Sequence, residues 1–131
     1  MSDQKDFVKK VQHAWRDPIA RFASLFHPEG TLFQQGMERP LKRDEITAHV
    51  SRVLTLMPDQ RIEVKRWGAN GDDGFIEWSA SATLRNQPIV WSGASRFTLR
   101  DGLIIEEIAY FDTLLLRSVE DDPTIKRGDP A

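Results

Sequence analysis

The sequence predicts an α+β domain in which helices come first and an antiparallel sheet follows. Apolar residues recur at helical spacing up to Met57, and from about residue 61 they alternate with polar residues. The turn signals between the later runs are short, so consecutive strands are expected to pair as antiparallel hairpins. Helices that precede such a meander must cover one of its faces.

Three helices are expected before the sheet. The first covers 6–15 and carries one apolar stripe: Phe7, Val8, Val11 and Trp15. The second begins with Asp17 as N-cap and Pro18 as first helical residue, and its stripe runs through Phe26 until Pro28 stops it. A short strand-like run over 30–35 and a turn over 36–40 lead to a third helix. That helix begins near Arg43 or Asp44, ends at Pro58-Asp59, and has this apolar face: Ile46, Val50, Val53, Leu54 and Met57.

Four strands are expected in the second half, at about 61–68, 74–85, 88–99 and 103–112. Three turn signals separate them: Asn70–Gly74, Asn86–Pro88 and Arg100–Gly102. In the second strand Trp78 shares a face with other apolar residues, and in the third Trp91 does. Small residues lie beside these two rings on the same face and predict a concavity unless the helices fill it closely: Ala80, Ala82, Gly93 and Ser95.

Composition excludes several classes of function. The 131 residues suit a single domain spanning 1–131, and a formal charge of −2 offers no positive field for nucleic acid or anionic membranes. The chain has no cysteine, which removes disulfides, thiolate nucleophiles and cysteine-ligated zinc. Its polar N-terminus precedes no long apolar stretch, so a cytoplasmic protein is expected. Neither a metal-binding motif nor a phosphate-binding glycine loop is present, and we expect no cofactor.

The last expected strand is apolar on both faces. Leu103, Ile105, Glu107, Ala109 and Phe111 share one face, whereas the other carries Ile104, Glu106, Ile108, Tyr110 and Asp112. A sheet with helices on only one side should bury its second apolar side against a partner. We therefore predict a homodimer through the outer face of the sheet.

The order of these elements resembles the nuclear-transport-factor-2-like cone, and specifically its SnoaL-like branch of polyketide cyclases and limonene-epoxide-hydrolase relatives. The likeness spans a core of about 5–116 and leaves 117–131 as a C-terminal tail. Six segments carry it: Ala14-Trp15-Arg16, Leu25-Phe26-His27-Pro28-Glu29-Gly30, Pro58-Asp59, Gly71-Asp72, Asp101-Gly102-Leu103-Ile104 and Tyr110-Phe111-Asp112. The resemblance implies a strongly curved sheet around a deep apolar cavity. Members of the branch use that cavity for cyclisation, epoxide hydrolysis, isomerisation or binding, so the fold does not select the function.

The resemblance also implies catalytic positions, and this chain departs from them. The acidic residue that relatives carry three positions before the final Asp112 is Ala109 here. The cyclases' auxiliary histidine corresponds to Ser95, and the hydrolases' Arg and Asp fall on Trp78 and Ala80. An alanine cannot transfer a proton, which disfavours both chemistries in their usual form.

Three other side chains are candidate proton-transfer groups. Glu107 has the parity of Ala109 and should project into the same cavity, where burial would raise its pKa. His49 lies on or beside the apolar stripe of the third helix and is a candidate base or donor. Asp112 matches a family position at a strand end, where a structural turn-capping role competes with chemistry. For Glu107 and His49 the structural alternatives are a solvated residue near the sheet edge and a satisfied core or rim histidine.

The expected ligand is small and mostly apolar or aromatic. Trp15, Trp78 and Trp91 converge on the presumed cavity, although the three rings would alternatively fill it themselves. The full set of expected pocket residues is Trp15, Val50, Trp78, Ala80, Trp91, Ser95, Phe97, Ala109 and Phe111. Two functions follow as hypotheses: general acid/base chemistry on a carbonyl or enol ligand, with Glu107 and His49 as the proton-transfer pair, or a non-catalytic ligand carrier or dimerisation module.

Overall fold

The computed structural model describes residues 2–112, and the predicted tail at 117–131 lies outside them. Helices and a 3-10 turn come first, with one strand and a two-residue strand between them, and four long strands follow. The bounds are α1 Ser2–Ala14, α2 Pro18–Arg21, η1 Ala23–Leu25, β1 Phe26–Gln34, β2 Leu41–Lys42, α3 Arg43–Leu56, β3 Arg61–Asn70, β4 Asp73–Leu84, β5 Gln87–Arg100 and β6 Leu103–Phe111.

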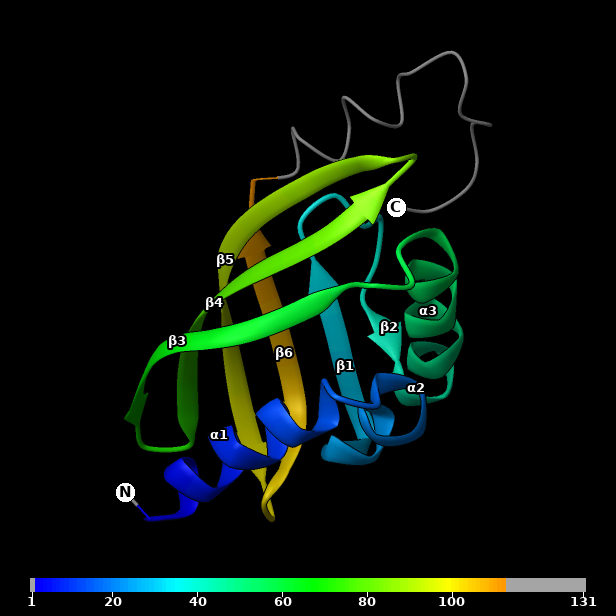
Figure 1. Ribbon diagram of the computed structural model, residues 1–131. Coiled ribbons are helices and arrows are strands. Elements are labelled where there is room, and N and C mark those ends of the chain that lie inside the picture. Colours follow the sequence, from blue (N-terminus) through cyan, green and yellow to red (C-terminus); the bar gives the residue numbers. More distant parts are fainter. Residues whose placement is uncertain (1, 113–131) are drawn as a thin grey trace.

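The strands form one sheet in the order β2-β1-β6-β5-β4-β3 (Figure 1). The strands from β3 to β6 pair with their sequence neighbours as antiparallel hairpins, as predicted. The purely antiparallel sheet expected from the sequence is wrong, however, because β1 joins β6 in parallel. Parallel neighbours need a long crossover connection, and here the rest of the domain supplies it. The two-residue β2, which was not expected, adds an antiparallel partner to β1.

Tight turns define the hairpins. Arg85 and Asn86 have φ values of 52° and 65°, and Asp101 and Gly102 have 55° and 78°. Two consecutive residues with positive φ form the type I′ turn, whose twist matches that of the flanking strands. The predicted turns at Asn86 and at Asp101-Gly102 are therefore confirmed in place, while Pro88 belongs to β5, where it lies opposite Thr83.

The second helix is shorter than its apolar stripe predicts. It ends at Arg21, and Phe26 already begins β1. Pro28 therefore lies inside a strand and does not stop a helix. The β1–β6 register shifts between Phe26 and Thr31, so Pro28 falls in the irregular stretch where no ladder hydrogen bond is required of its nitrogen.

A similar irregularity changes which residues of β6 face inward. The β5–β6 register shifts between Thr98 and Leu99, so that Thr98 lies opposite Glu106 and Leu99 opposite Ile104. The extra residue reverses the alternation, and Ile104 becomes fully buried with an exposed fraction of 0%. The expected inward direction of Leu103 and Ile105 is wrong for this reason, whereas Glu107 and Ala109 keep theirs.

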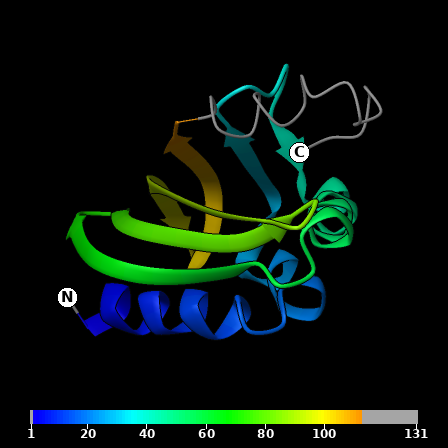
Figure 2. The same ribbon diagram turned by 45° about the horizontal axis from the view of Figure 1, so that its top comes forward.

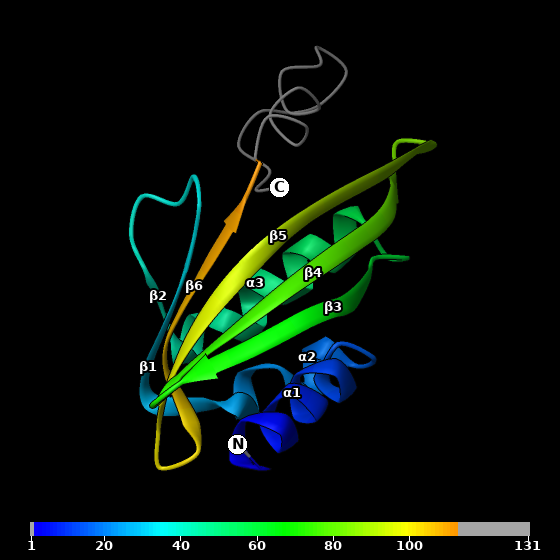
Figure 3. The same cartoon turned by 90° about the vertical axis from the view of Figure 1, so that its left-hand side faces the viewer.

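The helices lie together on one side of the sheet, as Figure 3 shows with α3 behind the strands. Figure 2 shows α1 running beneath the bent β3 and β4. We call the covered face the inner face and the opposite face the outer face. The main core lies between α1, α3 and the inner face: Phe7, Val8, Val11, Phe22, Phe26, Leu32, Ile46, Val50, Ile76, Phe97 and Ile104. Within the described residues, no helix is both long and apolar enough to cross a membrane.

Gly93 is required on β5, where it lies directly opposite Trp78 of β4. A β-carbon at this position would lie 2.7 Å from a Trp78 ring atom and would collide with the Tyr110 carbonyl oxygen. We expect Gly93→Ala to destabilise the fold by about 1–3 kcal/mol, because the backbone of the neighbouring strand cannot move away freely. Urea unfolding measures this. Gly68→Ala is the control, since a β-carbon there meets nothing within 4 Å, and equal stability of the two variants would contradict the prediction.

Candidate functional site

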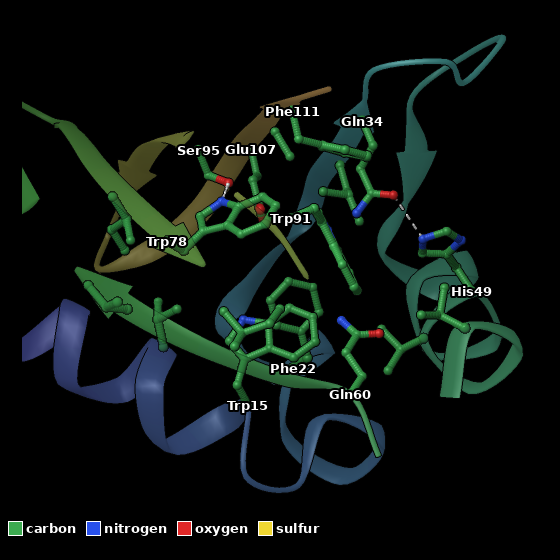
Figure 4. A pocket seen from close by; sticks show the side chains of 18 of the residues that line it. Trp15, Phe22, Gln34, His49, Gln60, Trp78, Trp91, Ser95, Glu107 and Phe111 are labelled. Atoms are coloured by element: carbon green, nitrogen blue, oxygen red, sulfur yellow. Dashed lines mark hydrogen bonds between the residues drawn. The ribbon is translucent and has the colours of Figure 1, made fainter. Parts of the chain in front are cut away.

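A cavity of about 100 Å³ lies between the inner face of the sheet and the helices (Figure 4). Its volume is enough for several water molecules or a small organic molecule. Most of the lining side chains are apolar: Val11, Trp15, Phe22, Leu32, Val50, Val53, Leu54, Met57, Ile62, Val64, Ile76, Trp78, Trp91, Phe97, Ala109 and Phe111. Five polar residues complete the lining: Gln34, His49, Gln60, Ser95 and Glu107.

Aromatic rings form much of the wall. Trp15 packs against Phe22 with ring centroids 4.8 Å apart, and Trp78 packs against Phe111 at 6.0 Å. Trp91 lines the cavity beside them (Figure 4). These rings line the cavity and do not fill it completely. Flat aromatic walls of this kind favour contact with a flat, largely apolar molecule.

Glu107 is the buried carboxyl of the cavity. It sits on β6 between Phe97 of β5 and Leu32 of β1, and only 5% of its surface is exposed. Burial raises the pKa of the Glu107 carboxyl to about 8, while a hydrogen bond with the Ser95 side chain opposes this rise. At neutral pH the group is therefore mostly a neutral acid, yet its ionised form is accessible. A pKa near the working pH is the property that a general acid or base needs.

A short chain of hydrogen bonds orients this carboxyl. The indole Nε1 of Trp78 donates to Ser95 Oγ over 3.0 Å. The Ser95 hydroxyl accepts that bond and so keeps its own proton for Glu107. Glu107 Oε1, by contrast, is buried and has no hydrogen-bond partner among residues 2–112. One carboxyl oxygen is thus hydrogen-bonded and the other is buried without a partner, in a residue that lines the cavity.

His49 reaches the cavity from α3 and bonds to Gln34 of β1. Its Nε2 lies 3.1 Å from Gln34 Oε1. Since an amide oxygen only accepts, the geometry assigns the proton to Nε2. Burial is the main cause that lowers the pKa of His49, and the positive charge of Arg52 lowers it further. The ring is therefore mostly neutral at pH 7. Figure 4 shows the Gln34 amide with its oxygen toward His49 and its nitrogen on the cavity side.

The two glutamines were not identified from the sequence. Gln34 has the same parity as Leu32 on β1, and Gln60 has the same parity as Ile62 and Val64 at the start of β3; all five residues line the cavity. Alternation could have indicated both positions. The expected strand at 61–68 begins at the same residue as β3, so Gln60 precedes the strand in both and was not assigned to a face. No inner face was assigned to the run at 30–35.

The expected site residues are not all brought together. Glu107 and His49 both line the cavity, and so do all expected pocket residues except Ala80: Trp15, Val50, Trp78, Trp91, Ser95, Phe97, Ala109 and Phe111. Ala80 is buried on β4 but does not reach the cavity surface. Asp112 is exposed just beyond β6 and does not line the cavity, because alternation along the strand directs it away from the face of Ala109 and Phe111. The proposed catalytic role of Asp112 is therefore not supported.

Metal ligands do not cluster in the part of the chain that the structure describes. No group of three or more His, Asp or Glu side chains is close enough there to hold an ion.

Comparison with protein families decides the classification. The model of the SnoaL-like domain matches residues 8–107. The chain belongs to the SnoaL-like family. The match covers α2, α3, most of the sheet and Glu107, and the resemblance identified from the sequence is confirmed. Comparison with curated proteins finds no significant match.

Solved structures share the fold of this SnoaL-like protein at low sequence identity. A Jannaschia sp. CCS1 protein provisionally assigned as a SnoaL-like polyketide cyclase has a TM-score of 0.80 and 13% identity, covering 93% of this chain and 94% of its own. TerC, co-crystallised with polyporic acid, gives 0.77 and 18%, covering 88% and 96%. An epoxide hydrolase of the limonene-epoxide-hydrolase-like type from M. tuberculosis gives 0.73 and 16%, covering 90% and 92%. Identities this low establish the fold alone.

The buried carboxyl predicts a pH-dependent stability. The Glu107 pKa is about 8 in the folded protein against 4.5 for the unperturbed group. The folded state therefore binds more protons than the unfolded state between these values, and the free energy of unfolding should fall by about 1.4 kcal/mol per pH unit across this window. Glu107→Gln removes the ionisation. Its stability relative to wild type should rise from pH 4.5 to 8 and stay constant outside that range.

Urea unfolding at a series of pH values measures this difference. Glu38→Gln, at an exposed position in the loop between β1 and β2, is the control and should parallel wild type. A Glu107→Gln curve that also parallels wild type would show that the carboxyl is not kept neutral by burial.

Proposed function

We propose that this protein is an acid/base catalyst for a small, mostly apolar carbonyl compound, with Glu107 as the proton-transfer group. The observation that carries the proposal is a buried carboxyl that lines an aromatic-walled cavity, is hydrogen-bonded to Ser95 and has its Oε1 left unpaired. Charge that develops on a ligand in such a site is little screened by water, so a few placed polar groups act strongly on it.

The proposed reaction is a proton transfer at a carbon next to a carbonyl. The Glu107 carboxylate takes the proton, the carbon–hydrogen bond breaks, and its electron pair moves onto the carbonyl oxygen as an enolate. The neutral Glu107 acid then returns the proton to the same carbon or to a conjugated one, and the carbonyl reforms. Atoms and charge balance without an oxidant, a reductant or a cofactor. The result is exchange or isomerisation.

Gln34 is suited to hold the carbonyl oxygen in this proposal. His49 occupies the Gln34 amide oxygen, which fixes the amide orientation and directs its N–H donors toward the cavity (Figure 4). An N–H donor stabilises the oxygen as it gains negative charge. His49 was expected to be the partner of Glu107 in proton transfer. Its bond to Gln34 favours a positioning role, because Nε2 is already engaged.

Relatives of the same fold support a small organic ligand. The comparison structures include a protein provisionally assigned as a polyketide cyclase, a co-crystal with polyporic acid and an epoxide hydrolase. The acid position implied by the family resemblance is Ala109 here, and Glu107 lies two residues earlier on the same face of β6. A carboxyl therefore remains in the cavity at a shifted place.

Deuterium exchange tests the proposal. We expect the protein to accelerate exchange of the methyl protons of acetophenone in deuterated water, followed by proton NMR. Glu107→Gln should lower the protein-dependent rate by about a hundredfold or more, the usual size of a general-base contribution. His49→Ala should lower it less. The rate should rise with pH and level off above about 8, because the ionised carboxyl is the base and its pKa is about 8.

Controls separate exchange catalysed by Glu107 from exchange caused by other groups of the protein or by the solvent. His49 is the other titratable residue that lines the cavity, and burial lowers its pKa, so its titration would not give a rate that levels off near pH 8. Glu38→Gln should exchange at the wild-type rate. Exchange by Glu107→Gln at the wild-type rate, with the variant folded by circular dichroism, would remove Glu107 as the base.

A second candidate function is that of a non-catalytic carrier of small apolar molecules. Ala109 favours it, because the position at which relatives carry an acid is apolar here. In that case quenching of tryptophan fluorescence would show that ligands bind, neither Glu107→Gln nor His49→Ala would alter binding, and no exchange would occur.

We also propose a homodimer through the outer face. Large apolar side chains are exposed there on β4, β5 and β6: Phe75 at 47%, Val90 at 71% and Tyr110 at 48%. Sedimentation velocity at micromolar concentration should give twice the chain mass of 15.0 kDa, and Val90→Glu should shift the protein toward monomer. Ile19→Glu, on α2, is the matched control. A wild-type monomer would refute the interface.

The cytoplasmic location stays a prediction.

A further inference from the structure

Two buried polar oxygens lack hydrogen-bond partners in the part of the chain between residues 2 and 112, and both belong to residues that line the same cavity. They are Glu107 Oε1 and Gln60 Oε1. Leaving a buried acceptor unpaired costs its full desolvation penalty, so such groups are rare in native proteins. Their occurrence in one cavity points to a ligand that supplies the missing partners.

Gln60 is held in place by its neighbours. Asp59 accepts hydrogen bonds from the Thr83 backbone N–H over 2.8 Å and from the Thr83 hydroxyl over 2.7 Å. The Gln60 backbone N–H donates to the Met57 carbonyl over 3.1 Å, and Met57 itself is buried. The segment between α3 and β3 is thereby tied to β4. Gln60 therefore lines the cavity from an anchored backbone, so a ligand bond to its side chain would not have to order a loose loop.

The two residues that carry the unpaired oxygens lie at separate parts of the cavity wall. Figure 4 shows Gln60 on the side of Phe22 and Trp15, and Glu107 beside Trp78 and Ser95. The surfaces between them are mainly aromatic and aliphatic. A ligand that satisfies both must therefore be polar at two places and apolar between them.

We infer that Gln60 is a specificity-determining residue whose amide oxygen accepts a hydrogen bond from a hydroxyl group of the ligand. The ligand class is then a hydroxylated aromatic or alicyclic carbonyl compound, with its enolisable carbon toward Glu107 and its hydroxyl at Gln60. A carbonyl compound without the hydroxyl leaves Gln60 Oε1 unpaired, and the site discriminates against it for that reason. The assignment of the carbonyl end rests on the proposed function; the hydroxyl contact at Gln60 does not.

Binding of two matched probes tests the inference. We expect p-hydroxyacetophenone to bind about tenfold more tightly than acetophenone, the size of effect given by one net hydrogen bond. Tryptophan fluorescence quenching measures both dissociation constants. Gln60→Met, which keeps a similar volume and removes the amide, should bring the ratio of the two constants close to one.

Gln35→Met is the control, because it makes the same change at an exposed position outside the cavity; it should keep the wild-type ratio. The ratio compares two ligands on the same protein. Partial unfolding of the Gln60→Met variant would weaken both apparent affinities equally and would leave the ratio unchanged. Should that variant not fold, equal affinity of the two probes for the wild-type protein would overturn the inference on its own. So would a ratio unchanged in Gln60→Met, or failure of p-hydroxyacetophenone to bind at millimolar concentration.

The outcomes remain distinct from those of the proposed function. If Glu107 is not a base, exchange of acetophenone is unaffected by Glu107→Gln, but the hydroxyl preference and its loss in Gln60→Met persist. If the Gln60 inference is wrong, exchange still depends on Glu107 and the two probes bind alike.

Discussion

The desolvation of one carboxyl organises this molecule. Glu107 has an exposed fraction of 5% and a pKa of about 8. A solvent-exposed glutamate would be ionised at neutral pH, whereas burial keeps this carboxyl mostly neutral. Burying a carboxyl carries a free-energy cost unless hydrogen bonds compensate. Here compensation is partial: Ser95 bonds to one oxygen, Trp78 donates to Ser95, and Oε1 has no partner among the described residues. A buried carboxyl oxygen without a hydrogen-bond partner is consistent with a binding site in which a ligand supplies that partner.

The sheet provides the cavity because its strands bend and its register shifts. The bent β3 and β4 lie over α1 (Figure 2). The irregular pairing in β6 buries Ile104 while keeping Glu107 and Ala109 on the inner face. Gly93 lets β5 pass close to Trp78. The indole ring can therefore lie against the sheet and still reach Ser95. Packing constraints and site geometry are met by the same few residues.

Local patterns were sufficient for much of this architecture. Helical spacing predicted α1 and α3, period-two alternation predicted the long strands, and Asn86 and Asp101-Gly102 marked their turns, because these features depend on residues close together in the chain. The inward direction of Glu107 and Ser95 followed from parity. The extent of α2 did not follow, because the helical spacing continues through Phe26, whereas Phe26 begins β1 and pairs with Ile104 of β6, which is distant in the chain.

What the sequence by itself determined is the order of the elements, the hairpins and the family, together with a carboxyl and tryptophans on one face. Only the tertiary structure decided that β1 pairs in parallel with β6, that Gln34 and Gln60 join the cavity, and that Asp112 is outside it. The physical reason is distance along the chain. A turn or an alternation is set by neighbouring residues, whereas partners such as His49 and Gln34, or Trp78 and Ser95, meet only when distant segments are packed together.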